Sequence, residues 1–270
     1  MNAITTTDAA AVSSDAVARF GSYAEAPEAL REDALLRIEA DPAVFFGAWT
    51  FEGGYAFSSV DGYGGDPCWL NVVGPAGPAE VLARTALAEL EARGQRCYGI
   101  TVPRELADAG WTAPGTATGT WDLMRCDAAP SAQPGEERVR PLPDPAAVQA
   151  FLERVNPHHS VRADHPEVEC WLGVTDEATG TPLALGAFTR RRFGTPYLAS
   201  IATAPEARGR GLGAAVTAAL TRHAFQAGDR MCTLAHFHPN DPARRIYLRL
   251  GYRTSHQLAS YRFPAPGAGS

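Results

Sequence analysis

The stretch Pro205–Val216, PEARGRGLGAAV, places three glycines and two arginines between a run that predicts a strand and a run that predicts a helix. Glycines let the backbone turn tightly and bring its N–H groups close to a ligand. The first N–H groups of a helix have no intrahelical partner and carry a partial positive charge, so such a junction binds anions. The stretch therefore predicts an anion-binding loop, and phosphate fits it.

The usual phosphate-binding motifs do not match this loop. No Lys-Ser or Lys-Thr pair follows the glycines, which excludes a P-loop. The glycines at 209, 211 and 213 do not give the G-x-G-x-x-G spacing of a Rossmann fold. What remains is an Arg-x-x-Gly-x-Gly pattern made by Arg208, Gly211 and Gly213.

The composition predicts a cytoplasmic protein that binds neither nucleic acid nor membrane. The chain has 270 residues and a net charge of −6, whereas phosphate-rich partners require clustered positive charge. Its five cysteines are scattered and form no C-x-x-C pair, which favours reduced thiols. The first twenty residues do not have the pattern of a signal peptide, and no apolar run reaches the roughly 18 residues of a membrane helix.

The C-terminal half alternates predicted strands and helices. A helix begins at Asp144 and Pro145, and a hairpin and a third strand follow it. The glycine loop then leads into a helix that ends at Gly228, and a strand, a helix over 240–251 and a final strand complete the half. This order predicts an α/β fold with a mixed, mostly antiparallel sheet flanked by helices.

The N-terminal half repeats this order without the arginine-glycine loop and without any histidine. It predicts a helix over about 27–39, a hairpin that turns at Gly53 and Gly54, and a helix that ends at Gly94. We interpret the chain as a diverged internal duplication. The predicted domains are residues 1–126 and 139–263, with a linker rich in Ala, Pro and Ser at 127–138 and a disordered tail at 264–270.

Two segments resemble successive motifs of the GNAT superfamily of N-acetyltransferases. ASIATAPEARGRGLGAAV is similar to the family's motif A, and HPNDPARRIYLRLGYR is similar to its motif B. The family pattern Asn-x-x-Ala-x-x-Leu-Tyr-x-x-x-Gly-Phe is matched by Asn240, Ala243, Ile246, Tyr247, Gly251 and Tyr252. The resemblance covers residues 137–263 and implies a tandem GNAT arrangement whose N-terminal copy is degenerate and walls the acceptor site.

The resemblance also implies a reaction and a set of site residues. Acetyl-CoA would be the co-substrate, no metal would be needed, and the acceptor would be a primary amine of a small molecule. Tyr247 matches the general acid that protonates the leaving thiolate, because a phenol with a reference pKa of about 10 is neutral at pH 7. An aliphatic residue is usual where Thr203 stands. The residues matched to acetyl-CoA binding are Ile201, Ala202, Thr203, Arg208, Gly209, Arg210, Gly211, Leu212, Gly213, Asn240 and Ala243.

The sequence does not identify the general base, because the strand before the loop carries no acidic residue. His158 and His159 lie where similar proteins shape the acceptor pocket. His236 and His238 lie at the end of the strand that follows motif A, and their spacing predicts that they share one face. A metal-binding H-x-H pair is an alternative, but no third ligand lies at useful spacing.

Weaker options for the base are Glu167, Glu169 and a water relay. Because no base is identified, a second function stays possible, that of a non-catalytic acyl-CoA sensor or scaffold. The intact Tyr247 favours an enzyme over this alternative. A third function, acyl transfer onto a protein amine, would use the same cofactor loop.

Overall fold

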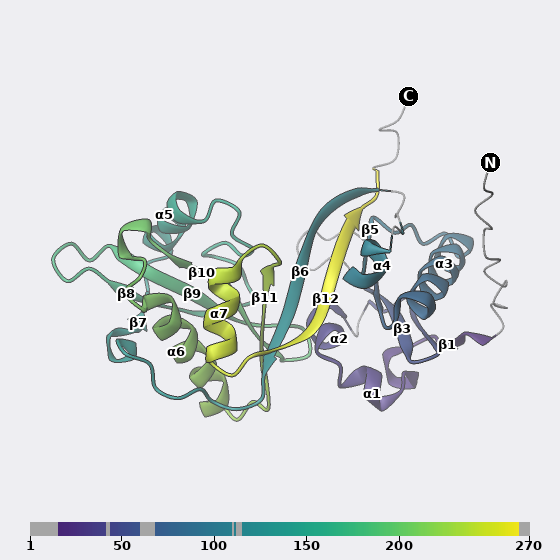
Figure 1. Cartoon of the computed structure of the whole chain (residues 1–270), viewed down its shortest axis with the longest axis horizontal. Coiled ribbons are helices and arrows are strands. Elements are labelled where there is room, and N and C mark those ends of the chain that lie inside the picture. The colour runs from purple at the N-terminus through teal and green to yellow at the C-terminus, as the bar shows by residue number, and fades with distance from the viewer. Residues whose placement is uncertain (1–15, 42–43, 60–67, 110, 112–114, 265–270) are drawn as a thin grey trace, which may run out of the picture. The chain divides into compact units, whose positions relative to one another are not determined.

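A computed structural model describes residues 16–41, 44–59, 68–109, 111 and 115–264 (Figure 1). The chain forms two compact units. The first unit contains residues 1–31, 43–118 and 259–270, and the second contains residues 32–42 and 119–258. None of the helices described in this structure is long and apolar enough to cross a membrane.

The first unit is a sheet with one long helix against it. Its strands follow the order β1 (Ala18–Phe20), β2 (Gly47–Phe51), β3 (Gly54–Ser59), β4 (Trp69–Val73) and β5 (Gly99–Pro103). Neighbours are antiparallel except β4 and β5, which are parallel because α3 (Ala76–Ala92) crosses between them. The unit also contains the short helices η2 (Tyr23–Glu25), α1 (Glu28–Arg31) and α4 (Arg104–Asp108).

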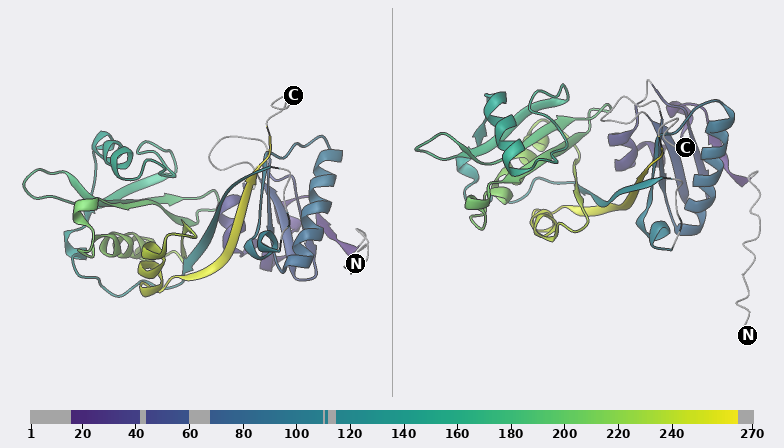
Figure 2. Two further views of the ribbon diagram at one scale, coloured as in Figure 1. Left: turned by 45° about the horizontal axis from the view of Figure 1, so that its top comes forward. Right: turned by 90° about the horizontal axis from the view of Figure 1, so that it is seen from above.

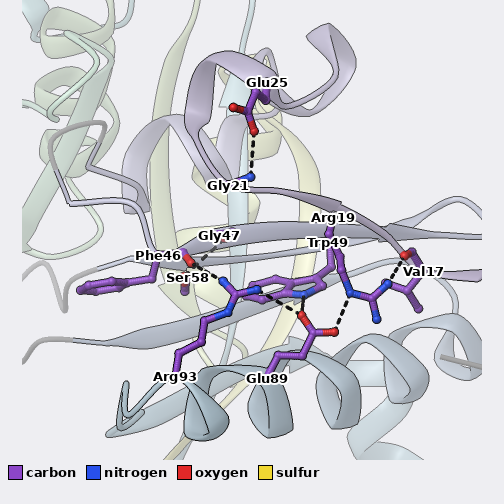
Figure 3. A network of polar contacts seen from close by, with 10 residues as sticks. All are labelled: Val17, Arg19, Gly21, Glu25, Phe46, Gly47, Trp49, Ser58, Glu89 and Arg93. Atoms are coloured by element: carbon purple, nitrogen blue, oxygen red, sulfur yellow. Dashed lines mark hydrogen bonds and ion pairs between the residues drawn. The ribbon is translucent and has the colours of Figure 1, made fainter. Parts of the chain in front are cut away.

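One carboxylate fastens α3 to the strands of the first unit (Figure 3). Glu89 accepts hydrogen bonds from Trp49 Nε1 at 2.9 Å and from Arg19 Nε at 2.6 Å, and Arg93 adds an ion pair at 3.4 Å. Burial alone would raise the pKa of Glu89, but the bonds from Trp49 and Arg19 outweigh it and hold that pKa below its usual value. This network contains none of the predicted site residues, so we assign it a structural role.

The predicted single helix over 27–39 is wrong. The structure has two short helices there, α1 and α2 (Ala34–Glu39). Asp33 separates them, because its extended backbone ends the first helix and its side chain accepts the N–H groups of Leu35 and Leu36 as the N-cap of the second.

The second unit confirms the mixed, mostly antiparallel sheet. Among the strand pairs whose register is described in this unit, only β10 and β11 are parallel, and α6 (Leu212–Gln226) connects them. Helix α5 (Pro145–Val155) packs against β9 and β10, and Figure 2 shows it on the face opposite to α6 and α7 (Asp241–Arg249). The strand order is β6 (Thr116–Cys126), β11 (Cys232–Phe237), β10 (Pro196–Thr203), β9 (Pro182–Arg190), β8 (Val168–Thr175) and β7 (Arg140–Pro141).

Residues 127–138, the predicted linker, are an ordered part of the second unit. Glu136, in the short helix η3 (Glu136–Arg138), pairs with Nε of Arg222 on α6 at 2.8 Å. Arg222 also donates to the carbonyl of Pro130 at 3.0 Å. The composition of this segment is typical of a linker, but a pairing partner 86 residues away cannot be read from local composition.

The strand β6 departs most from the predicted division of the chain. Its residues 121–126 pair with β11, from Cys232 opposite Cys126 to Phe237 opposite Trp121. A strand from the predicted N-terminal domain is thus part of the second unit's sheet. Conversely, the end of β12 (Arg253–Arg262) belongs to the first unit, where Ser260 Oγ lies 2.9 Å from Thr101 Oγ1. Residues 265–270 of the predicted tail lie outside the described residues.

Candidate active site

The glycine loop joins the end of β10 to the start of α6, as the sequence predicts. Gly209 and Gly211 have positive φ angles of 76° and 77°, and Gly211 is the N-cap of α6. No side chain caps this helix, and a Cβ atom at either glycine would meet nothing within 4 Å. Arg208 and Arg210 are exposed on the same loop. The first N–H groups of α6 are therefore available to an anionic ligand, with two cations beside them.

Gly213 allows the start of α6 to approach β10 closely. A Cβ atom there would lie 3.2 Å from Thr203 Oγ1 and 3.8 Å from Ile246 Cδ1. The hydroxyl of Thr203, the residue that departs from the family's aliphatic position, therefore packs against the first turn of α6. This close approach fixes the loop directly at the end of β10.

A β-bulge in β10 opens the strand next to the loop. The register with β9 shifts between Ala199 and Ala202, and Ser200 has a positive φ of 51°. The parallel pairing of β10 with β11 is confined to Tyr197 and Leu198. In the described structure, the part of β10 that contains Ile201 to Thr203 therefore has no strand partner on its β11 side. An extended ligand has room for backbone hydrogen bonds there, and sequence analysis missed the bulge.

Ser200 also anchors the loop between α5 and β8, which carries His158 and His159. Its Oγ accepts from Val161 N–H at 3.1 Å and donates to the Val161 carbonyl at 3.4 Å. His159 uses both ring nitrogens locally, since Nδ1 lies 3.0 Å from the Asn156 carbonyl and Nε2 lies 3.3 Å from Gln149 Nε2. His158 is exposed. His158 is therefore the more exposed of the two.

The motif B helix, α7, carries the candidate general acid. Asn240 is its N-cap and accepts the N–H of Ala243 at 3.3 Å. Tyr247 is 7% exposed, and its hydroxyl has no hydrogen-bond partner among the described residues. Burial raises the pKa of Tyr247 to about 12, because the phenolate would lose its hydration. The phenol therefore holds its proton at neutral pH and is able to donate it.

The two histidines at the end of β11 differ in environment. The side chain of His236 is 2% exposed, and its ring centroid lies 5.9 Å from that of Tyr247. His238 lies beyond the last residue of β11 and is exposed. The alternation rule that predicted a shared face does not extend to His238, because the strand ends at Phe237.

Sequence analysis missed Asp122, the residue opposite His236. The two face each other across the antiparallel pair of β6 and β11, and Asp122 Oδ2 lies 3.9 Å from His236 Nε2. The Asp122 side chain is 1% exposed. No sequence signal pointed to it, because Asp122 precedes the stretch that resembles a GNAT domain. Within the described ranges, no group of three His, Cys, Asp or Glu side chains could hold a metal ion.

The equivalent junction in the first unit is built differently. The chain passes from β4 to α3 through Gly74, where a Cβ atom would lie 2.5 Å from the Cα of Gly54. The turn between β2 and β3 thus occupies the space next to this junction. The register of β3 with β4 runs without a bulge from Tyr55 opposite Val73 to Ser59 opposite Trp69. The described residues of this unit form neither an open glycine loop nor a bulged strand at this junction.

The chain was compared with curated proteins and with solved structures. No curated protein matches the chain. A "GCN5-related N-acetyltransferase" from Kribbella flavida is 19% identical with a TM-score of 0.51, over 81% of this chain and 90% of that chain. A putative GNAT-family acetyltransferase from Novosphingobium aromaticivorans is 18% identical with a TM-score of 0.49, over 78% and 88% of the two chains. A tandem GNAT protein from the clavulanic acid biosynthesis pathway is 15% identical with a TM-score of 0.44, over 84% and 85%.

The Kribbella flavida structure supports the fold, whereas the family assignment rests on the sequence. The model of the "Acetyltransferase (GNAT) family" matches residues 136–252, which include both the glycine loop and Tyr247. The match covers less than half of the chain and identifies residues 136–252 as a GNAT acetyltransferase domain.

Proposed function

We propose that the protein is an N-acetyltransferase that transfers the acetyl group of acetyl-CoA to a primary amine of a small molecule. The observation that carries this proposal is the uncapped, open start of α6 next to the bulged part of β10. Pyrophosphate fits the helix start, because exposed N–H donors and the helix dipole both favour negative charge. The pantetheine arm fits the β10 edge, which offers backbone groups to an extended ligand.

The chain's own residues supply the parts of a direct transfer. In such a transfer the amine, once it has lost a proton, attacks the thioester carbonyl. Backbone N–H groups of Ile201 to Thr203 would stabilise the resulting oxyanion. Tyr247 would donate its proton to the departing thiolate, and a proton released by the attacking amine would replace it. His238 and His158 are the exposed candidates for taking the proton of the ammonium group, directly or through water.

We further propose one acetyl-CoA site per chain, in the second unit. Among the described residues of the first unit, the junction at Gly74 has no open loop, because the turn at Gly54 fills the space beside it. This is what a degenerate GNAT copy in a tandem protein would show. The proposed setting is a cytoplasmic enzyme that needs no metal, nucleic acid or membrane.

A turnover assay tests the proposal. Acetyl-CoA is incubated with a panel that includes a polyamine, an aminosugar, an arylalkylamine, free amino acids and a lysine-containing peptide, and free thiol and acetylated product are measured. Turnover with a small amine supports the proposal. Turnover with the peptide alone would indicate that the acceptor is an amine of a protein. If calorimetry shows one acetyl-CoA per chain but no amine is acetylated, the protein is a sensor or scaffold. Two equivalent sites would contradict the single-site proposal.

A further inference from the structure

Asp122 and His236 form a buried pair behind the candidate general acid. They are directly opposite residues of β6 and β11, so their side chains project from the same face of the sheet. Both side chains are almost fully excluded from solvent, at 1% and 2% exposure. A carboxylate held this far from water requires polar partners, because an uncompensated charge is costly to bury.

The hydrogen bond on the other side of the ring fixes the orientation of His236. Nδ1 lies 2.8 Å from the carbonyl oxygen of Phe237, which can only accept, so Nδ1 carries the hydrogen. Nε2 therefore points toward Asp122 Oδ2 at 3.9 Å and has no hydrogen-bond partner among the described residues. Two acceptors facing each other at a buried position are unfavourable. One hydrogen between the two atoms, with a small closure of the gap, converts the contact into a hydrogen bond.

The ring held in this way supports Tyr247. The ring centroids of His236 and Tyr247 are 5.9 Å apart, with an angle of 45° between the planes. The other ring against Tyr247 is that of Tyr252, at 6.1 Å. The part of the chain that the structure describes offers the Tyr247 hydroxyl no hydrogen bond that would fix it. Packing against these two rings therefore contributes to holding Tyr247 in place.

We propose that Asp122 is a positioning residue for acetyl transfer, which holds His236 in the orientation that places Tyr247 at the leaving thiolate. The inference rests on the proposed function and adds a residue from the N-terminal half of the sequence to the site. Asp122 and His236 exchange no atoms with the substrates. The ammonium group loses two protons in the overall reaction, of which one replaces the proton that Tyr247 gave to the thiolate and the other goes to solvent.

Steady-state kinetics with acetyl-CoA and the best amine of the panel test this role. In Asp122→Ala we expect kcat to fall about 10²-fold, the order of loss for a misplaced catalytic group, while KM for acetyl-CoA changes less than threefold. Asp122→Asn should stay within about tenfold of wild type, because its amide supplies the hydrogen to Nε2 and keeps the ring in place. If the Asn variant is as slow as the Ala variant, positioning through this hydrogen bond is wrong.

Thr233→Val is the matched control. Thr233 lies on the same strand, is fully buried, and donates a 2.6 Å hydrogen bond to the Pro196 carbonyl. Its loss should lower the melting temperature and leave kcat unchanged. A fall in kcat like that of Asp122→Ala would mean that strand stability, rather than positioning, is responsible, and would overturn the proposal.

A measurement that needs no acceptor separates this inference from the proposed function. Histidine ¹⁵N NMR of the full chain should show a hydrogen-bonded Nε2 in His236, and Asp122→Ala should shift that resonance while Nδ1 stays constant. An unchanged Nε2 resonance would overturn the pairing. If no amine is acetylated by the wild type, the proposed function fails, and the NMR result still decides whether Asp122 holds His236.

Discussion

Replacing Gly211 by Asp tests the anion-binding loop directly. Gly211 has a φ of 77° and open space around it, so the fold should accept the side chain at the ordinary cost of the left-handed region, about 1–2 kcal/mol. Asp is also one of the residues that adopt this region most readily. The main effect should therefore be on the ligand, because a carboxylate would stand at the start of α6, where the pyrophosphate is expected.

The expected loss of affinity follows from Coulomb's law. Two phosphate charges at about 5 Å from the new carboxylate cost about 1.7 kcal/mol at the dielectric constant of water, and several-fold more where water is displaced. The dissociation constant of acetyl-CoA should therefore rise by at least about 15-fold. Raising the ionic strength should recover part of the loss, since exposed charges are screened.

Isothermal titration calorimetry with acetyl-CoA measures the effect, and Gly194→Asp is the control. Gly194 has a φ of 69° and open space as well, but it lies in the turn between β9 and β10. It should lose a similar amount of stability and keep wild-type affinity. A folded Gly211→Asp variant with unchanged affinity would refute the assignment of the loop.

Four further predictions concern other parts of the molecule. Tyr247→Phe should lower kcat about 10²–10⁴-fold with little change in acetyl-CoA affinity, and wild-type kcat would remove Tyr247 from the mechanism. Because burial raises the pKa of Tyr247 to about 12, against about 10 when unfolded, its contribution to stability is complete below pH ~10 and is lost as pH rises towards 12. Urea midpoints of Tyr247→Phe should therefore fall less over that range than those of wild type. Hydrogen peroxide should oxidise Cys68 and Cys97 to a disulfide, because their sulfur atoms lie 2.8 Å apart. Each disulfide releases two water molecules. A thiol titration that still finds all five cysteines would contradict this prediction. The fragment 139–263 should fail to fold, since it lacks β6, and a cooperative unfolding transition of that fragment would be the contrary result.

The sequence predicts the second unit well because its signals are local. The cap at Asp144, the glycine closing α6 and the N-cap at Asn240 each satisfy backbone groups within one turn of the chain. The same holds for the loop that starts α6, whose positive φ angles require glycine at 209 and 211. A pattern of a few adjacent residues is enough to place such features.

The features that sequence analysis missed depend on partners far along the chain. The bulge at Ser200 shows itself in the register between β9 and β10, and serine gives no local signal for a positive φ. The segment 127–138 is ordered by the ion pair of Glu136 with Arg222. Asp122 comes to lie opposite His236 through the pairing of β6 with β11. Composition and periodicity depend on residues that are neighbours in sequence. They therefore do not predict the bulge, the ordered segment or the position of Asp122.

The path of β6 gives a physical reason why the two halves of the sequence stay joined. Without β6, strand β11 would present an open edge beside Thr233 and Leu234, which are only 0% and 1% exposed. An exposed edge of this kind pairs with other chains and leads to aggregation. The last residues of the chain serve the first unit in the same way, through Ser260 and the hydrogen bond of Phe263 N–H to the Tyr98 carbonyl at 2.7 Å. Each unit thus takes a strand segment from the other half of the sequence, so loss of an acyl-donor site from the first unit would not make that half dispensable. Removing the first half of the sequence would open the edge of β11 and take Asp122 away from His236.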